Sequence, residues 1–122
     1  MLTAWYANGQ KSAEFRFTEG AVDGLEKLWY SNGEIYFTAV EINGKDQGMV
    51  KWSYPNGKPM AEENNYYDNL HGVCRLYYPG GVLRSEENYY NGDQEGVSKY
   101  YDETGHLKQT RVYYYGVLQA VY

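Results

Sequence analysis

The fold is decided by residues 49–66, which read MVKWSYPNGKPMAEENNY. The run before Asn56-Gly57 is rich in aromatic and branched residues, as β-strands are. An Asn-Gly pair between two such runs is the strongest short-range hairpin signal, because a type I′ turn needs positive φ at both central residues. We therefore predict a β-hairpin with a two-residue type I′ turn at Asn56-Gly57.

The same pattern recurs every 24 residues along the whole chain. One column of glycines marks the predicted turns: Gly9, Gly33, Gly57, Gly81 and Gly105. A fixed period of this kind indicates a repeat architecture rather than one compact core. We expect an all-β fold, a single-layer twisted antiparallel meander of about five hairpin repeats. One repeat domain would span 1–122, with units of approximately 1–24, 25–48, 49–72, 73–96 and 97–122.

A second, longer connection joins one hairpin to the next. In one unit it reads Asn43-Gly44-Lys45-Asp46-Gln47-Gly48. Two glycines in a segment of this length favour a wider hairpin loop.

The turn at Asn56-Gly57 also predicts which residues face one another. A two-residue loop places Lys51 opposite Glu62. The same count gives three more pairs: Arg75 with Glu86, Lys27 with Thr38, and Lys99 with Thr110. Opposite charges across a strand pair contribute roughly 0.2–1 kcal/mol, which supports this register.

Strand alternation sorts the side chains into two faces. The face expected to be packed is mostly apolar: Leu28, Tyr30, Ile35, Phe37, Trp52, Tyr54, Pro59, Ala61, Leu76, Tyr78 and Leu83. The other face carries the charged columns and an aromatic stripe: Trp5, Trp29, Tyr77 and Tyr101. A single layer leaves this stripe uncovered, so it is a candidate partner-binding surface. The alternative is that the rings shelter one another and the stems of Lys51 and Arg75.

The composition favours a protein that works through its surface. Of the 122 residues, 16 are Tyr, and the aromatic share of 18% must supply much of the apolar area. The formal net charge of −5 disfavours nucleic-acid binding and favours a basic protein partner. Acidic residues in the connections, Asp46, Asp93 and Glu95, are a second candidate surface for such a partner.

The sequence contains no recognisable catalytic or metal-binding constellation. His71 and His106 lie in connections, outside the repeating columns, and the single Cys74 makes neither an internal disulfide nor a cysteine zinc site. The acidic connections lack the dense alternating acids of a calcium loop. We therefore expect no enzymatic activity, no cofactor and no metal.

Targeting signals are also absent from the sequence. No apolar run approaches the roughly 18 residues of a membrane span, and the N-terminus lacks the basic and apolar regions of a secretory signal. We expect no membrane insertion and a cytoplasmic location. Open edge strands at the two ends of the meander make an edge-strand homodimer a further expectation.

The repeat resembles the MORN (membrane occupation and recognition nexus) repeat variant. The shared pattern is Tyr-x-Asn-Gly, then x4-Glu-x3-Tyr, then x-Gly-x3-Gly, and it is clearest from Tyr54 to Gly72 and from Tyr78 to Gly96. Three residues depart from it: Ser53 and Asp102 replace aromatic residues, and Asp68 replaces a turn glycine.

Chains built of this variant resemble the YwqK-type antitoxin or immunity proteins of bacterial toxin systems. The resemblance implies an elongated sheet that neutralises a cognate, basic toxin domain by direct binding and occlusion. Two alternatives remain open: a scaffold that mediates protein assembly, and a membrane-surface module. The acidic balance weakens the membrane alternative, because anionic headgroups attract basic segments.

Overall fold

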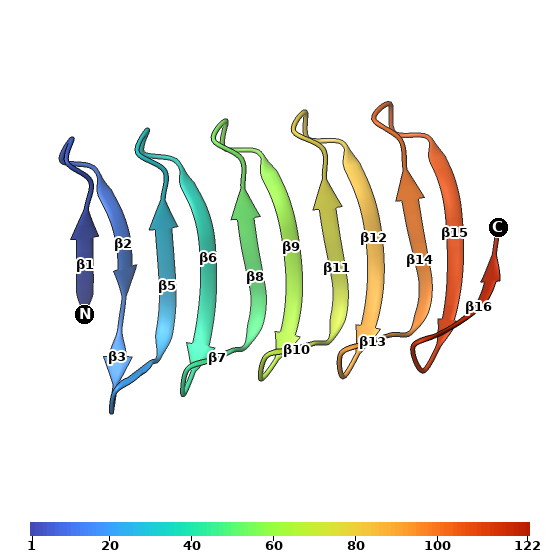
Figure 1. Ribbon diagram of the computed structural model, residues 1–122, viewed down its shortest axis with the longest axis horizontal. Coiled ribbons are helices and arrows are strands. Elements are labelled where there is room, and N and C mark those ends of the chain that lie inside the picture. The colour runs from blue at the N-terminus through green and yellow to red at the C-terminus, as the bar shows by residue number, and fades with distance from the viewer.

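The computed structural model describes all 122 residues as one antiparallel meander. Figure 1 shows a single layer of strands that bow in the same direction, with the two chain termini at opposite ends of the sheet. The chain contains no helix of the length and apolar character that crossing a membrane requires. The prediction of an all-β, single-layer repeat sheet is confirmed.

Each unit contributes one strand that leads into the corner at the first glycine column and one that returns from it. The leading strands are β1 (Leu2–Trp5), β5 (Gly24–Trp29), β8 (Gly48–Ser53), β11 (Gly72–Tyr77) and β14 (Gly96–Tyr101). The returning strands are β2 (Lys11–Phe15), β6 (Ile35–Ile42), β9 (Pro59–Tyr66), β12 (Leu83–Tyr90) and β15 (Leu107–Tyr114). The remaining strands flank the second connections: β3 (Phe17–Thr18), β4 (Ala21–Val22), β7 (Lys45–Asp46), β10 (Asn69–Leu70), β13 (Asp93–Gln94) and β16 (Val117–Val121).

The hydrogen-bonded order of the sheet follows the chain: β1-β2-β5-β6-β8-β9-β11-β12-β14-β15-β16. The short strands β7, β10 and β13 each pair with the returning strand before them, and β3 pairs with β4. Strands that neighbour in sequence therefore neighbour in space, so each unit contacts the units beside it.

The corners at Asn-Gly are not type I′ turns, and that prediction is wrong. Gly57 has a φ of 83°, but Asn56 does not have a positive φ. The Gly57 N–H donates to the Tyr54 carbonyl (2.9 Å), and the Tyr54 N–H donates to the Lys58 carbonyl (2.8 Å). This is a three-residue loop, in which a type I turn is followed by a left-handed glycine.

The predicted pairing is nevertheless correct, because a β-bulge beside each corner compensates for the extra loop residue. In the β8–β9 hairpin the register shifts between Trp52 and Ser53, so that Ser53 faces Pro59 while Trp52 faces Ala61. Beyond the bulges all four predicted pairs are present: Lys51 with Glu62, Arg75 with Glu86, Lys27 with Thr38, and Lys99 with Thr110.

The bulges also change the face of one residue in each of three units. Three residues expected on the packed face pair directly with residues of the other face: Ile35 with Trp29, Pro59 with Ser53, and Leu83 with Tyr77. Directly paired residues project from the same face, so these three lie beside the aromatic stripe. The extra residue of the bulge interrupts the simple alternation from which their face was predicted.

The type I′ turns lie instead at the second connections. Asn43 and Gly44 have φ values of 53° and 79°, and Tyr67 and Asp68 have values of 46° and 71°. Only these two residues separate β6 from β7 and β9 from β10. The prediction of a wide loop at residues 43–48 is therefore wrong. This segment consists of a tight turn, the two-residue strand β7 and the residues that lead into β8.

The most buried residues are small and lie on one face of the sheet: Ala39, Val50, Ala61, Asn65, Cys74, Ser85 and Ser98. We call this the packed face, and the face that carries Lys51, Glu62 and Arg75 the charged face. No second layer covers the packed face, so larger side chains of the same face must shelter the small ones. Phe37 and Trp52, whose ring centroids are 5.4 Å apart, belong to this cover.

Candidate protein-binding surface

A row of alternating charges crosses the middle of the charged face. Lys51, Glu62, Arg75, Glu86 and Lys99 are each directly paired with the next, across five consecutive strands. Arg75 Nε donates to Glu86 Oε2 at 2.9 Å, and this hydrogen bond raises the pKa of Arg75. Most charges in this row have an opposite charge beside them within the chain.

The N-terminal half of the predicted aromatic stripe gathers around a cation. The Lys11 ammonium lies 5.5 Å from the centre of the Trp29 ring and 5.7 Å from that of Trp5. Cation–π attraction of this kind contributes about 0.5–1 kcal/mol at exposed sites. Trp29 is half-buried, whereas Trp5 is 62% exposed and still offers its ring to solvent.

The C-terminal half of the stripe is separate. Ser53 interrupts the column between Trp29 and Tyr77, and Tyr77 and Tyr101 are half-buried on β11 and β14. The Tyr77 hydroxyl donates to Glu62 Oε1 at 2.6 Å. Burial and this carboxylate raise the pKa of Tyr77 to about 12. Tyr77 is therefore bonded into the charged row.

The acidic residues of the connections do not form one surface. Asp46 pairs with Glu41 on the packed face, whereas Asp93 pairs with Tyr90 on the charged face. Positions 46 and 93 differ by one residue less than two repeats, and an odd offset reverses the face of a strand. Only Asp93 and Glu95 lie on a common side, next to Tyr90.

A carboxylate cluster on the packed face has no cation partner, and sequence reasoning missed it. Burial, together with Glu26 and Asp46, raises the pKa of Glu41 to about 7. Burial and Asp68 raise the pKa of Asp46, and burial and Asp46 raise the pKa of Glu63. None of the ion pairs in the chain involves these residues. No group of acidic, histidine or cysteine side chains has an arrangement that would hold a metal ion.

Exposed tyrosines line the border of the charged face at the second connections, and these also were missed. Tyr66, Tyr90 and Tyr114 recur at the 24-residue period and are 53%, 56% and 59% exposed. The turn residues Tyr67 and Tyr115 pack edge-to-face on Tyr66 and Tyr114, with centroids 4.8 and 4.5 Å apart. The period was visible in the sequence, but only the structure shows that this column faces solvent.

Side chains just after the short strands cap the turn of the following unit. Three acceptors one repeat apart each bond a turn N–H: Gln47 Oε1 to Tyr67 (3.0 Å), His71 Nδ1 to Asn91 (3.4 Å) and Glu95 Oε2 to Tyr115 (2.7 Å). The same structural task is therefore done by an amide, an imidazole and a carboxylate. His71 has this role although it belongs to no column of identical residues.

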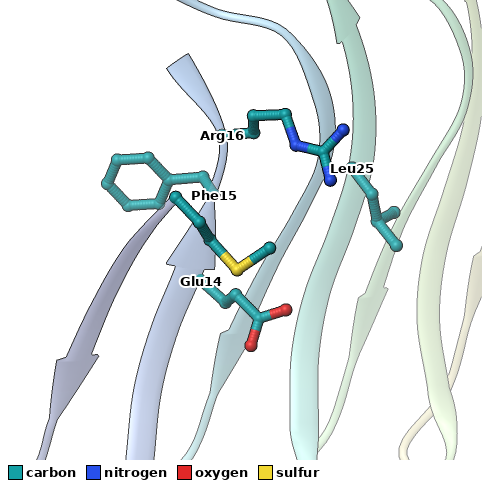
Figure 2. A pocket seen from close by; sticks show the side chains of 5 residues that line it. Glu14, Phe15, Arg16 and Leu25 are labelled. Atoms are coloured by element: carbon teal, nitrogen blue, oxygen red, sulfur yellow. The ribbon is translucent and has the colours of Figure 1, made fainter.

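Three surface hollows contain charged side chains beside apolar or aromatic ones, one of them at Lys108 and Tyr122. The first, of about 290 Å³, lies near the N-terminal edge (Figure 2). There the Arg16 guanidinium lies beside Leu25 and the Phe15 ring points away from it. Glu14 in this hollow already accepts a 2.9 Å hydrogen bond from Lys11, which lowers the pKa of its carboxyl.

The second hollow lies at the border where the exposed tyrosines gather. Its volume is about 280 Å³, and it is lined by Tyr90, Glu95 and Tyr115. Of the residues predicted to bind a partner, Glu95 is the one that the structure places in a hollow with exposed aromatic rings.

The family model of the MORN repeat variant matches residues 46–69, 70–91 and 94–114. Each matched segment contains one leading strand, one corner and one returning strand of the sheet. A search of curated proteins finds no match to the chain. Since the matched segments cover more than half of the sequence and coincide with its hairpins, the chain belongs to the MORN repeat variant family.

Proposed function

We propose that this chain is a non-catalytic module that binds a basic protein partner, and that it acts as an immunity protein which neutralises a toxin by occlusion. Membership of the MORN repeat variant family indicates a repeat module that binds proteins or membranes.

The observation that carries the proposal is the column Tyr66, Tyr90 and Tyr114. More than half of each side chain is exposed, and the three recur along one border of an extended sheet. Tyrosine is enriched where proteins bind one another, because it buries a large area at a low cost in side-chain entropy. Formation of the sheet does not require a periodic row of exposed rings, so this row is the feature that favours a role in binding.

Electrostatics favour a basic partner over an anionic membrane. The net charge is −5, and Glu26, Glu41, Asp46 and Glu63 have no cation beside them. Such a surface steers a basic protein towards it and repels anionic headgroups. Both histidines are engaged in turns, His71 with Asn91 and His106 with Thr104, which supports a role without catalysis.

The test is co-expression with the product of the neighbouring gene. We expect that product to arrest growth of a host cell when expressed alone, and growth to resume when this chain is expressed with it. The two proteins should then copurify as a complex of fixed stoichiometry. A neighbouring product that is harmless and binds the chain would indicate the scaffold alternative. Co-sedimentation with phosphatidylserine vesicles, without a protein complex, would indicate the membrane alternative.

The aromatic stripe is tested in the same complex. Trp29→Ala and Tyr77→Ala should lower the stability of the chain, because these side chains contact Lys11 and Glu62. Trp5→Ala removes a ring that is mostly exposed. A stripe that binds the partner requires all three variants to weaken the complex. A stripe that is only structural requires Trp29→Ala and Tyr77→Ala to leave partner affinity unchanged.

A further inference from the structure

The hollow lined by Tyr90, Glu95 and Tyr115, which we call the tyrosine slot, forms where two units stack. Tyr90 ends β12 and Glu95 follows β13, whereas Tyr115 lies in the turn after β15. The two rings are 56% and 66% exposed. The Tyr115 ring also packs edge-to-face on Tyr114, with ring centroids 4.5 Å apart.

At the corresponding place one repeat earlier, where Asn91 stands in the position of Tyr115, the border is occupied by an imidazole of the chain itself. His71 precedes Glu95 by 24 residues, and Tyr66 precedes Tyr90 by the same interval. The His71 ring centroid lies 6.0 Å from that of Tyr66 and 5.0 Å from that of Tyr90. A flat, nitrogen-bearing group therefore already packs between tyrosines at this border. In the next unit the corresponding residue is a glutamate, and the slot stays open.

The turn after β15 does not require the negative charge of Glu95. Glu95 Oε2 accepts the Tyr115 N–H at 2.7 Å, but Gln47 caps the equivalent Tyr67 N–H with a neutral amide at 3.0 Å. No ion pair within the chain involves Glu95. A carboxylate that lines a hollow together with two exposed rings is thus left available to a ligand.

We propose that the tyrosine slot receives an arginine side chain of the protein partner. A guanidinium is attracted to tyrosine faces and is flat, so it packs against the exposed Tyr90 and Tyr115 rings, just as the flat His71 ring contacts Tyr66 and Tyr90 one repeat earlier. Its fork of N–H donors pairs with a carboxylate, whereas a lysine ammonium is a strongly hydrated point charge that does not stack. The inference rests on the proposed function, because it names the side chain by which the basic partner is recognised.

The first test uses the capped peptide Gly-Arg-Gly, titrated into the isotope-labelled chain and followed by the backbone amide resonances. The Tyr115 amide reports directly, because its N–H is bonded to Glu95. We expect this resonance to shift on binding. The matched peptide with citrulline, which has the same shape without the charge, should bind at least about tenfold more weakly. The Gly-Lys-Gly peptide should bind with an affinity between the two.

Three variants locate the binding. Glu95→Gln keeps the cap, as Gln47 shows, and Tyr115→Asn keeps the turn, because Asn43 and Asn91 occupy the equivalent positions. Each should raise the Kd of the arginine peptide by about five- to tenfold. Glu103→Gln removes the same charge at an exposed corner and should leave the Kd within about twofold.

The inference is overturned if the Tyr115 amide does not move, if the citrulline peptide binds equally well, or if Glu95→Gln behaves like Glu103→Gln. None of these results bears on the proposed function, which is tested separately by whether the chain forms a complex with the neighbouring gene product. Conversely, selective arginine binding without any such complex would support the slot and remove the immunity role.

Discussion

At the residue scale, the tyrosines of four corners, and asparagines where they are present, form hydrogen bonds between repeats. The hydroxyls of four tyrosines donate to carbonyls 23 residues further on, at 2.6–2.8 Å: Tyr6 to Trp29, Tyr30 to Ser53, Tyr54 to Tyr77, and Tyr78 to Tyr101. Asn56 Nδ2 likewise donates to the Pro79 carbonyl at 3.1 Å. Part of the unusual tyrosine content is therefore explained by hydroxyls that bond one repeat to the next.

Tyr54→Phe tests one of these bonds. The variant keeps the ring but leaves the partly buried Tyr77 carbonyl without its partner. We expect the free energy of unfolding to fall by about 1–2 kcal/mol, measured by urea denaturation. Tyr122→Phe is the control, because its side chain is 79% exposed, and it should change stability by less than about 0.5 kcal/mol. Equal stability of the two variants would contradict the role of the Tyr54 hydroxyl.

At the element scale, each unit uses two hairpin connections with different backbone demands. The corner needs one left-handed residue, and the second connection needs two. Asn-Gly occurs at both, as Asn56-Gly57 and as Asn43-Gly44, so the dipeptide alone does not identify the turn type. At the corner Asn56 Oδ1 accepts the Lys58 N–H at 2.9 Å, which supports the type I form, and the Gly80-Gly81 corner has the same backbone bonds without a side chain.

Gly80 and Gly81 separate the two turn types by substitution. Gly81 has a φ of 97°, whereas Gly80 lies outside the left-handed region, and an added Cβ meets nothing within 4 Å at Gly80. Gly81→Ala should therefore destabilise the chain by about 1–2 kcal/mol. Gly80→Ala should be neutral or stabilise it by up to about 1 kcal/mol. A type I′ corner would instead make both variants destabilising in thermal or urea unfolding.

At the scale of the whole molecule, the two faces handle charge differently. The charged face sets basic and acidic residues opposite one another, as in the 2.9 Å bond between Arg75 and Glu86. The packed face brings Glu26, Glu41 and Asp46 together with no cation. Because the sheet has one layer, both faces remain available to a partner, and the packed face carries the carboxylates whose pKa values are raised: Glu41, Asp46 and Glu63.

The pH dependence of stability follows from the raised pKa of Glu41. This pKa is about 7 in the folded chain against 4.5 for a free side chain, so the folded state binds the extra proton between these values. The contribution of Glu41 to stability is therefore fully present below the free value and is lost as the pH rises through 7. Glu41→Gln should be more stable than the wild type at about pH 8, by on the order of 1 kcal/mol after solvent screening, and equal to it at about pH 4.

Urea denaturation at the two pH values measures this difference, and Glu103→Gln controls for the loss of one exposed charge. The control should follow the wild type at both values. A stability difference between Glu41→Gln and the wild type that does not change with pH would contradict the raised pKa.

The open edges of the sheet predict self-association of the 122-residue chain. β16 reads VLQAV and has no charged side chain to oppose pairing with another strand, and Val117 is 60% exposed. We expect the sedimentation coefficient to rise with concentration as copies pair edge to edge. Val117→Lys should weaken this association by about tenfold, whereas Leu2→Lys tests the opposite edge at β1. A sedimentation coefficient that is independent of concentration would contradict the dimer.

Much of the candidate site was beyond sequence reasoning for a specific reason. The strand register was predictable, because the pairing of Lys51 with Glu62 follows from counting outward from Asn56-Gly57. The slot at Tyr90 was not, because it depends on how the Tyr115 turn of the next unit stacks against Glu95. Periodicity locates equivalent residues in a repeat. Whether the space between two neighbouring units is filled or open depends on side chains from both units.

The sequence by itself determined the 24-residue hairpin, the single layer and the pairing of charges across the strands. These follow from local turn preferences and from alternation along a strand, which are properties of neighbouring residues. Only the tertiary structure decided the turn types, the raised pKa of Glu41 and the open slot at Tyr90. Each of these depends on bulges or on contacts between units, where residues far apart in the sequence share one surface.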